Sequence, residues 1–181
     1  RESCNPYYNE VADIVSDYMK EISKITGREY RPFNYYGAAD AENIIICMGS
    51  ACEAIREVID YEAAKGNKKL GLINVHLYRP FSLKYLQEAL PKSVKRICVL
   101  DRTKEPGANG EPLYLDVKDA LDELGLKDLL VVGGRYGLGS NDTTPAQMLA
   151  VFENLALPEP KNHFTVGIND DVTFTSLPVG E

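Results

Sequence analysis

What this sequence most clearly lacks is a long apolar run. None of its apolar runs approaches the roughly 18–20 residues that a helix needs to span a bilayer, so no membrane partner is expected. Basic residues are also in deficit, since 20 Lys and Arg stand against 27 Asp and Glu and give a net charge of −7. A nucleic-acid-binding surface needs a basic stripe, so we expect no nucleic acid partner.

Cysteines are few and are not clustered. The four cysteines are Cys4, Cys47, Cys52 and Cys98, and no two of them have C-x-x-C spacing. That spacing is typical of zinc and iron–sulfur sites, so we expect no metal site in this chain. Cys47 and Cys98 fall in apolar runs and Cys52 in the first turn of an expected helix, which favours buried free thiols. Free thiols fit a reducing cytoplasm.

The common catalytic and nucleotide-binding motifs are missing as well. There is no G-x-S-x-G elbow, and neither His76, expected inside a strand, nor His163 has a nucleophile placed beside it. Neither G-x-x-x-x-G-K-[ST] nor G-x-G-x-x-G occurs. Asp170-Asp171 is a candidate for a cation, although the spacing of a calcium loop is absent around it. We therefore assign no catalytic residue from the sequence.

What is present is an alternation of short apolar runs with helical periodicity. Apolar runs of this kind indicate strands covered on both faces, and their alternation with helices predicts a parallel sheet. We predict a three-layer α/β/α fold with a mostly parallel sheet of about five strands, and leave a reversed edge strand open. The expected strands are 44–48, 70–78, 97–100 and 129–133, and the expected helices are 51–63, 83–90, 113–124 and 145–155.

Both ends of the chain differ from this pattern. Apolar residues at spacings of three and four predict a long amphipathic helix from about Asn5 to Gly27, whose stripe must pack on the sheet domain or on a neighbour. A Tyr- and Arg-rich extended linker is expected next. Two β-prone pieces near the end indicate a hairpin or an arm into a following domain. The predicted division is 1–41, 42–157 and 158–181.

One glycine-rich turn, Gly133 to Thr144, is the best candidate for an anion site. Its glycines let backbone amides approach an anion, and the helix after Thr144 adds a favourable dipole. A structural turn or a domain contact is the alternative. The polar loop 101–112 follows another strand, where open α/β sheets place ligands or partners. The candidate residues for an anion or domain contact are Arg102, Arg135, Gly137, Gly139, Ser140 and Thr144.

Four motifs, in order along nearly the whole chain, resemble the pyruvate:ferredoxin (flavodoxin) oxidoreductase family. They are residues 30–37 (YRPFNYYG), 100–107 (LDRTKEPG), 134–140 (GRYGLGS) and 164–173 (FTVGINDDVT). The order of elements is also similar to the C-terminal domain of transketolases and 2-oxoacid dehydrogenases. This resemblance implies the second domain of a longer protein, and the start at Arg1 without a methionine suggests the same.

The resemblance also implies what the whole enzyme does. The family decarboxylates pyruvate on thiamine diphosphate and Mg²⁺, passes electrons through [4Fe-4S] clusters to ferredoxin or flavodoxin, and forms acetyl-CoA as a homodimer. The thiamine motif that begins Gly-Asp-Gly and the cysteine clusters are absent from this chain. We therefore expect a non-catalytic structural domain, inactive alone and without a cofactor, that positions other domains of the same polypeptide. The alternative is a CoA- or phosphate-binding module that uses the Gly133–Thr144 turn. Exposed apolar patches in an excised domain would favour self-association.

Overall fold

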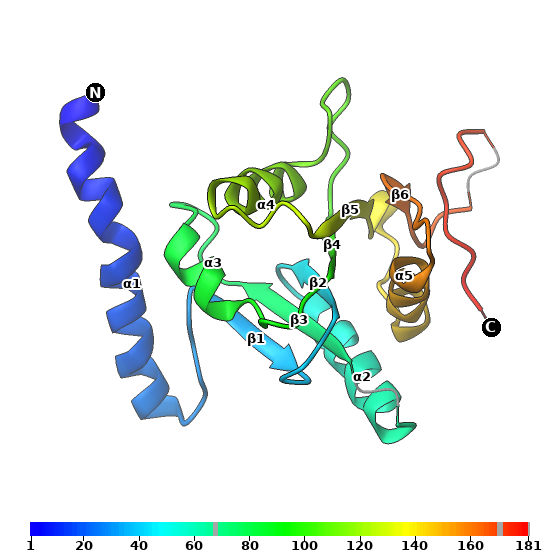
Figure 1. Ribbon diagram of the computed structural model, residues 1–181, viewed down its shortest axis with the longest axis horizontal. Helices are drawn as coiled ribbons and strands as arrows, with labels where there is room; N and C mark the ends of the chain where they lie inside the picture. Colours follow the sequence, from blue (N-terminus) through cyan, green and yellow to red (C-terminus); the bar gives the residue numbers. More distant parts are fainter. Residues whose placement is uncertain (67–68, 170–171, 181) are drawn as a thin grey trace.

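The computed structural model describes residues 1–66, 69–169 and 172–180 (Figure 1). Its elements are a short 3₁₀ helix Glu2–Cys4, α1 Asn5–Thr26, β1 Phe33–Gly37, β2 Asn43–Cys47, α2 Ala51–Ala64, β3 Leu70–Val75, α3 Leu83–Ala89, β4 Arg96–Asp101, α4 Pro112–Glu123, β5 Leu130–Arg135, a second 3₁₀ turn Leu138–Ser140, α5 Pro145–Ala156 and β6 Phe164–Thr165. Within these described ranges, no helix is both long and apolar enough to cross a bilayer. The candidate cation pair Asp170-Asp171 lies outside the described residues.

A single mostly parallel sheet forms the centre of the molecule. Its six strands lie in the order β1-β3-β2-β4-β5-β6, and β1 alone among them runs antiparallel to its neighbour. The prediction of a mostly parallel sheet is confirmed, and the edge strand is reversed. The strand that sequence analysis missed is β1, which lies in the segment expected to be a linker. Its aromatic residues alternate between the two faces of the sheet, as the period of a strand requires.

Helices cover both faces of this sheet, which confirms the three-layer prediction. Because successive strand residues point to opposite faces, Ile44 and Ile46 of β2 enter one core and Ile45 and Cys47 enter the other. The first core is completed by α3 and α4 through Leu86, Leu113, Val117 and Leu121. The second is completed by α2 and α5 through Ile55, Ile59, Met148, Val151 and Leu155.

Local capping chemistry sets where two of the helices begin. The Ser82 side chain accepts a hydrogen bond from the N–H of Tyr85 at the start of α3. At the start of α5, Thr144 and Gln147 form a reciprocal capping box, and Pro145 occupies the first helical position. Both helix starts agree with the predicted ones.

Two strand ends differ from the predicted ones. β3 stops at Val75, so His76 is not inside a strand, and its side chain is exposed. The N–H groups of His76 and Leu77 both donate to the carbonyl of Pro32, which ends the pairing with β1 because Pro32 has no N–H to return. At the other expected boundary, β5 continues past Gly133 through Arg135.

The two ends of the chain lie on opposite sides of the sheet (Figure 1). Helix α1 stands beside α3, and its Asp13 carboxylate accepts hydrogen bonds from Lys84 Nζ at 2.8 Å and from the Tyr85 hydroxyl at 2.6 Å. At the C-terminal end, Thr165 of β6 bridges in parallel to Ser176. A hairpin would be antiparallel, so the hairpin alternative is wrong. The tail instead runs along β6, and Leu177 is buried in the α2/α5 core.

Candidate functional site

The strand order makes the carboxyl end of β2 a topological switch point, because β3 and β4 lie on opposite sides of it. A tyrosine that follows β5, two strands away, reaches the loop after β2. Tyr136 follows β5, is buried, and donates its hydroxyl hydrogen to the carbonyl of Met48 at 3.2 Å. Burial raises the pKa of Tyr136, so the phenol keeps its proton and its donor role. The loops after β2 and β5 are thereby joined across β4.

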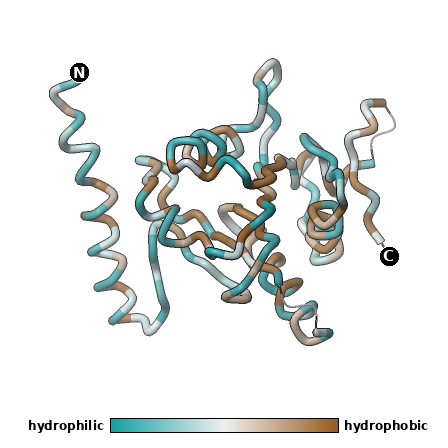
Figure 2. Tube along the Cα trace, in the orientation of Figure 1, coloured by the Kyte–Doolittle hydropathy of each residue, from teal (hydrophilic) through white to brown (hydrophobic). Residues whose placement is uncertain are grey.

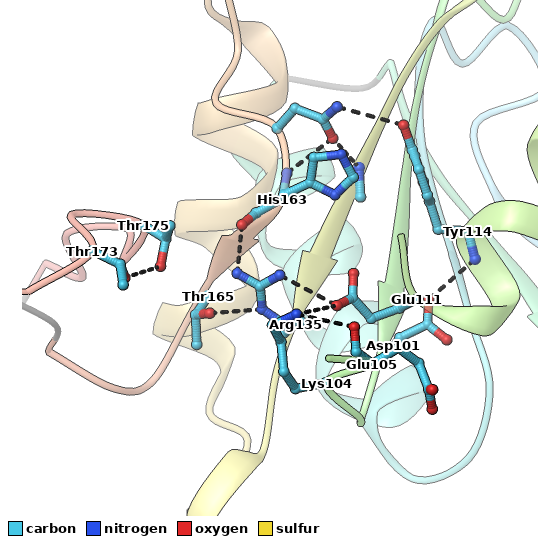
Figure 3. Close-up of polar contacts among 12 residues, drawn as sticks. Asp101, Lys104, Glu105, Glu111, Tyr114, Arg135, His163, Thr165, Thr173 and Thr175 are labelled. Atoms are coloured by element: carbon cyan, nitrogen blue, oxygen red, sulfur yellow. Dashed lines mark hydrogen bonds and ion pairs between the residues drawn. The ribbon is translucent and has the colours of Figure 1, made fainter. Parts of the chain in front are cut away.

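A buried ion pair lies between β5, β6 and the start of α4 (Figure 3). Arg135 Nη1 is 3.3 Å from Glu111 Oε1, and both side chains are at most 8% exposed. Arg135 Nε donates to Thr165 Oγ1 at 3.0 Å, and Nη2 donates to the carbonyl of His163 at 2.5 Å. Each nitrogen of the guanidinium group that carries hydrogen is therefore bonded inside the fold. Lys104 Nζ, on the protein surface, is 3.8 Å from the same Glu111 oxygen.

A second buried carboxylate caps helix α4 from the end of β4. Asp101 accepts hydrogen bonds from the N–H of Leu113 at 2.9 Å and from the N–H of Tyr114 at 3.1 Å. Burial raises the pKa of Asp101, and these two N–H donors lower it in part. Because Asp101 precedes the loop 102–110 and α4 follows it, the cap ties the two ends of that loop together.

Aromatic rings explain why β5 contains two adjacent glycines. A Cβ built on Gly133 would lie 2.9 Å from the ring of Tyr114, and one on Gly134 would lie 2.2 Å from the ring of Phe164. The Tyr114 ring also meets the His163 ring edge to face, with 5.3 Å between centroids. Gly133 and Gly134 are therefore strand residues that make room for aromatic rings. The expectation that the glycine-rich turn begins at Gly133 is wrong, because the strand continues through Arg135.

The six candidate residues fall into separate places. Arg102 and Gly137 come together, since a Cβ on Gly137 would lie 2.8 Å from Arg102 Nε. Gly139 and Ser140 follow in the exposed 3₁₀ turn, both with positive φ. Thr144 lies beyond them, where its hydroxyl accepts the N–H of Gln147 at 3.3 Å. Arg135 is apart from this group, in the buried ion pair with Glu111.

Sequence reasoning did not single out Asp101, Glu111 or Tyr136. A signal was present for the first, because a carboxylate directly after an apolar strand lies where the next helix can use it as a cap. Glu111 and Tyr136 are contacts between distant parts of the chain. Their partners are 24 and 88 residues away, so no local pattern indicates them.

The donor groups of this chain do not fit an iron–sulfur cluster. Cys47, Cys52 and Cys98 are buried in the α2/α5 core, whereas Cys4 is exposed before α1 at the far side of the molecule. Burial also raises the pKa of Cys98, which holds it as a thiol, whereas a cluster ligand is a thiolate. Among the residues that the structure describes, no group of three or more His, Cys, Asp and Glu side chains is placed to hold a metal ion.

The sequence was also similar to a known protein family and to known proteins. The family described as "Pyruvate:ferredoxin oxidoreductase core domain II" matches residues 41–148, more than half of the chain. The pyruvate-flavodoxin oxidoreductase of Enterobacter agglomerans is 55% identical over 181 residues, which are 100% of this chain and 15% of that protein. The pyruvate:ferredoxin oxidoreductase of Moorella thermoacetica is 56% identical over the same length, again 100% and 15%.

A solved structure also matches at low similarity. It is a 2-oxoglutarate:ferredoxin oxidoreductase from Magnetococcus marinus with 2-oxoglutarate, coenzyme A and succinyl-CoA bound. Its sequence identity is 14% and its TM-score 0.43, over 74% of this chain and 20% of that chain. The chain spans about 15% of the length of each of the two oxidoreductases from Enterobacter agglomerans and Moorella thermoacetica.

Proposed function

The chain belongs to the pyruvate:ferredoxin oxidoreductase family as its core domain II, and from this premise we propose that it is a non-catalytic structural domain of a larger enzyme. The larger enzyme oxidises and decarboxylates pyruvate to acetyl-CoA and passes the electrons to ferredoxin or flavodoxin in the cytoplasm. Thiamine diphosphate with Mg²⁺ supplies the decarboxylation chemistry and [4Fe-4S] clusters carry the electrons, each held by parts of the polypeptide outside this chain. The role of this chain is to hold those parts in place.

The observation that carries this proposal is the internal pairing of two charged residues at the strand ends, Arg135 of β5 and Asp101 of β4. In open α/β enzymes, side chains at the carboxyl ends of the strands are offered to a ligand. Here the three guanidinium nitrogens of Arg135 bind Glu111, Thr165 and His163, and Asp101 binds two amides of α4. Groups that are bound to the fold itself act as braces, because each guanidinium nitrogen that carries hydrogen makes a bond within the protein.

What these braces position is the loop 102–110, which projects from the molecule between β4 and α4 (Figure 1). Most of its residues are exposed, from Lys104 to Asn109, while Gly110 and Glu111 at its end are buried. The cap on α4 and the Lys104–Glu111 ion pair fix its base. We propose that this braced loop is a contact surface for a neighbouring domain of the same polypeptide.

The proposal is tested by comparing this 181-residue chain with the longer enzyme. Purified separately, the chain is expected to oxidise no pyruvate with a viologen dye and CoA, while the longer enzyme does so. In the longer enzyme, shortening the loop by replacing residues 104–109 with two glycines should lower the turnover number and leave cofactor content unchanged. Pyruvate oxidation by the chain alone would overturn the assignment, and an unaffected turnover number would remove the role of the loop.

A second candidate function rests on Arg102. Its side chain lies against Gly137, so a cation is held beside the amides of the turn that precedes α5. We infer from this contact that a phosphate, such as those of CoA, is the ligand this turn would accept. Calorimetry with CoA, inorganic phosphate and thiamine diphosphate tests this. Binding of CoA at millimolar concentration or tighter, lost in Arg102→Ala and retained in the control Arg28→Ala, supports it; heats equal to buffer dilution contradict it.

A further inference from the structure

A cavity of about 700 Å³ lies between helix α1 and the rest of the chain. Its walls come from α1, from residues between 29 and 35, and from α3. Figure 1 shows α1 standing apart from the sheet on this side, and Asp13 of α1 is bonded to Lys84 and Tyr85 of α3. Pockets that bind small molecules have volumes of about 300–1,000 Å³. The cavity is therefore large enough for a ligand or for a side chain from another part of a longer protein.

The side of α1 that faces this cavity carries small side chains. Figure 2 shows hydrophilic and hydrophobic residues recurring in turn along α1. Ser16 and Ser23 line the cavity from this helix, and they lie on one side of it because they are seven residues, about two turns, apart. A serine side chain is too short to reach the opposite wall, so α1 does not fill the space itself. Protein interiors otherwise leave few voids larger than a water molecule, so the space is open for another group.

The opposite wall of the cavity is aromatic. Tyr30, Phe33 and Tyr35 line it from the segment that leads into β1, and Tyr85 lines it from α3. The faces of such rings attract both apolar groups and cations. An ammonium group of this chain already takes such a position, since Lys84 Nζ lies 4.8 Å from the centre of the Tyr85 ring. The charges around the cavity decide which kind of ligand the wall accepts.

Those charges leave one carboxylate unpaired. Each of the three cations that line the cavity is paired with a carboxylate of this chain at 2.6–2.8 Å: Lys20 with Asp17, Lys84 with Asp13, and Arg31 with Glu29. Glu88 of α3 also lines the cavity, is exposed, and makes no ion pair or hydrogen bond with any other described residue. The charge that remains for a ligand is therefore negative, which favours a cation over an anion.

We propose that this cavity binds an organic cation, an ammonium group on an aliphatic stem. The ammonium group pairs with the carboxylate of Glu88 and contacts the tyrosine rings, and the stem occupies the space beside Ser16 and Ser23. A free amine and a lysine side chain from another part of the longer protein share this chemistry. The cavity is lined by other residues than the loop 102–110 and the turn before α5, so the inference does not depend on the proposed function.

The first test compares three small molecules that have the same four-carbon stem. Butylammonium, butanol and butyrate are titrated into the ¹⁵N-labelled 181-residue chain at constant ionic strength. The chain has a complete core on both faces of its sheet, so it is expected to fold by itself. We expect butylammonium to give saturable amide shifts at residues 29–35 and 83–89, with a dissociation constant of about 1–10 mM. Equal shifts with butanol, or stronger shifts with butyrate, would overturn the proposal, because the site would then be apolar or anion-binding.

The second test removes the proposed contacts one at a time. Glu88→Gln removes the charge and keeps the shape, so it should weaken butylammonium binding about fivefold. Tyr30→Leu keeps an apolar side chain and removes the ring, so it should weaken binding about threefold. The matched control is Glu153→Gln, which changes another exposed helical glutamate, on α5 at the opposite face of the sheet, and should leave binding unchanged. Circular dichroism checks that the variants stay folded. Unchanged binding in Glu88→Gln would show that the carboxylate is not the partner and would overturn the proposal.

The third test separates the two sources of the cation in the longer protein. A carbodiimide joins a carboxylate to an amine that contacts it, and mass spectrometry of the peptides identifies the two partners. A link from Glu88 to a lysine outside these 181 residues assigns the cavity to another part of the polypeptide, whereas coupling of Glu88 to added butylamine assigns it to a free amine. A Glu88 that couples to neither, or only to Lys20 or Lys84 of its own chain, overturns the proposal.

Discussion

Two regions of the molecule differ in which side chains they bury: the carboxyl edge of β4 and β5, and the outer face of α1. At the strand edge, charged groups such as Arg135 and Glu111 are buried and bonded to each other. On α1, apolar groups such as Tyr18 and Ile25 are exposed to solvent. The strand edge buries charged residues of a kind that normally faces ligands. Helix α1 exposes apolar residues of a kind that normally forms a core.

The difference shows which region is complete within this chain. A buried charge is tolerated only when it is paired and hydrogen-bonded. At the strand edge Arg135 and Asp101 are bonded within the fold, and Glu111 is bonded through Oε1, whereas its buried Oε2 has no hydrogen-bond partner among the described residues. A wide exposed apolar stripe marks a surface that another protein surface covers. Substitutions at the strand edge should therefore act on the stability of the single chain, whereas those on α1 should act on association.

The largest effect is expected from breaking the buried ion pair. Arg135→Met removes the cation and leaves Glu111 buried without it, which should lower the free energy of unfolding by about 3–5 kcal/mol. The matched control is Arg79→Met, which breaks the exposed pair with Asp116 and should cost under about 1 kcal/mol. Urea denaturation followed by circular dichroism measures both. Equal costs for the two variants would remove the distinction between the two kinds of pair.

Removing the charges of both Arg135 and Glu111 tests whether the cost comes from leaving one buried charge unpaired. In the double variant Arg135→Met with Glu111→Leu, no buried charge is left alone, so much of the lost stability should return. The coupling between the two sites, obtained from the double-mutant cycle, is expected to be at least about 2 kcal/mol. Additive costs would show that Arg135 acts mainly through Thr165 and His163, not through Glu111.

The next largest effect is expected at the glycine beneath Phe164. Gly134→Ala places a Cβ 2.2 Å from this fully buried ring, which must shift to make room for it, and should cost about 1–3 kcal/mol. Gly180→Ala, with no atom within 4 Å of the new methyl group, is the control and should leave the unfolding transition unchanged. A stable Gly134→Ala chain would mean that β6 and its ring can shift away from β5 at little cost.

Local chemistry explains why much of the fold was predictable from the sequence. The apolar runs of β2 and β4 and the caps at Ser82 and Thr144 depend on neighbours in the sequence, and all were placed correctly. β1 was missed because its strand residues lie among Tyr, Arg and Pro that are equally typical of a linker. Its role depends on pairing with β3, about 40 residues away, which no local pattern reports.

The site was less predictable than the fold for the same reason. Gly137 and Arg102 were both singled out, and the structure brings them together. Arg135 was singled out as an anion contact, but a buried carboxylate from another loop already occupies its guanidinium group. The sequence shows that Arg135 follows an apolar run. Whether its side chain faces solvent or pairs with Glu111 depends on the path of the loop 102–110, which places Glu111. Whether any of the six candidates binds an anion stays a prediction.

A smaller effect is expected at the cap of α4. Asp101→Asn keeps one acceptor oxygen for the N–H groups of Leu113 and Tyr114 and should cost about 1 kcal/mol. Burial raises the pKa of Asp101 above its usual 3.8, so the folded chain holds this proton more tightly than the unfolded chain. The stability contributed by this group is therefore present below pH 3.8 and lost as the pH rises through its raised value.

Because the pKa of Asp101 is raised, the effect of Asp101→Asn on stability should depend on pH. The difference in unfolding free energy between the unchanged chain and Asp101→Asn should be larger just below the usual carboxyl pKa than at pH 7, because the asparagine cannot titrate. Urea denaturation at several pH values measures it. A difference that grows toward pH 7 would mean that the two N–H donors outweigh burial and that the pKa of Asp101 is lowered.

The smallest effect on the single chain is expected where α1 meets α3. Hydrogen bonds from Lys84 and then from Tyr85 lower the pKa of Asp13, so this contact is present above the usual carboxyl value of 3.8 and is lost as the pH falls below it. Asp13→Ala should leave the urea midpoint unchanged and raise amide hydrogen exchange within α1, because a helix fixed by exposed contacts opens without unfolding the sheet. Acidification should raise exchange in the unchanged chain and have little further effect in the variant. Exchange that rises equally in α1 and β4 would show instead that α1 and the sheet unfold as one cooperative unit, and the contrast between a complete strand edge and a loosely attached helix would fail.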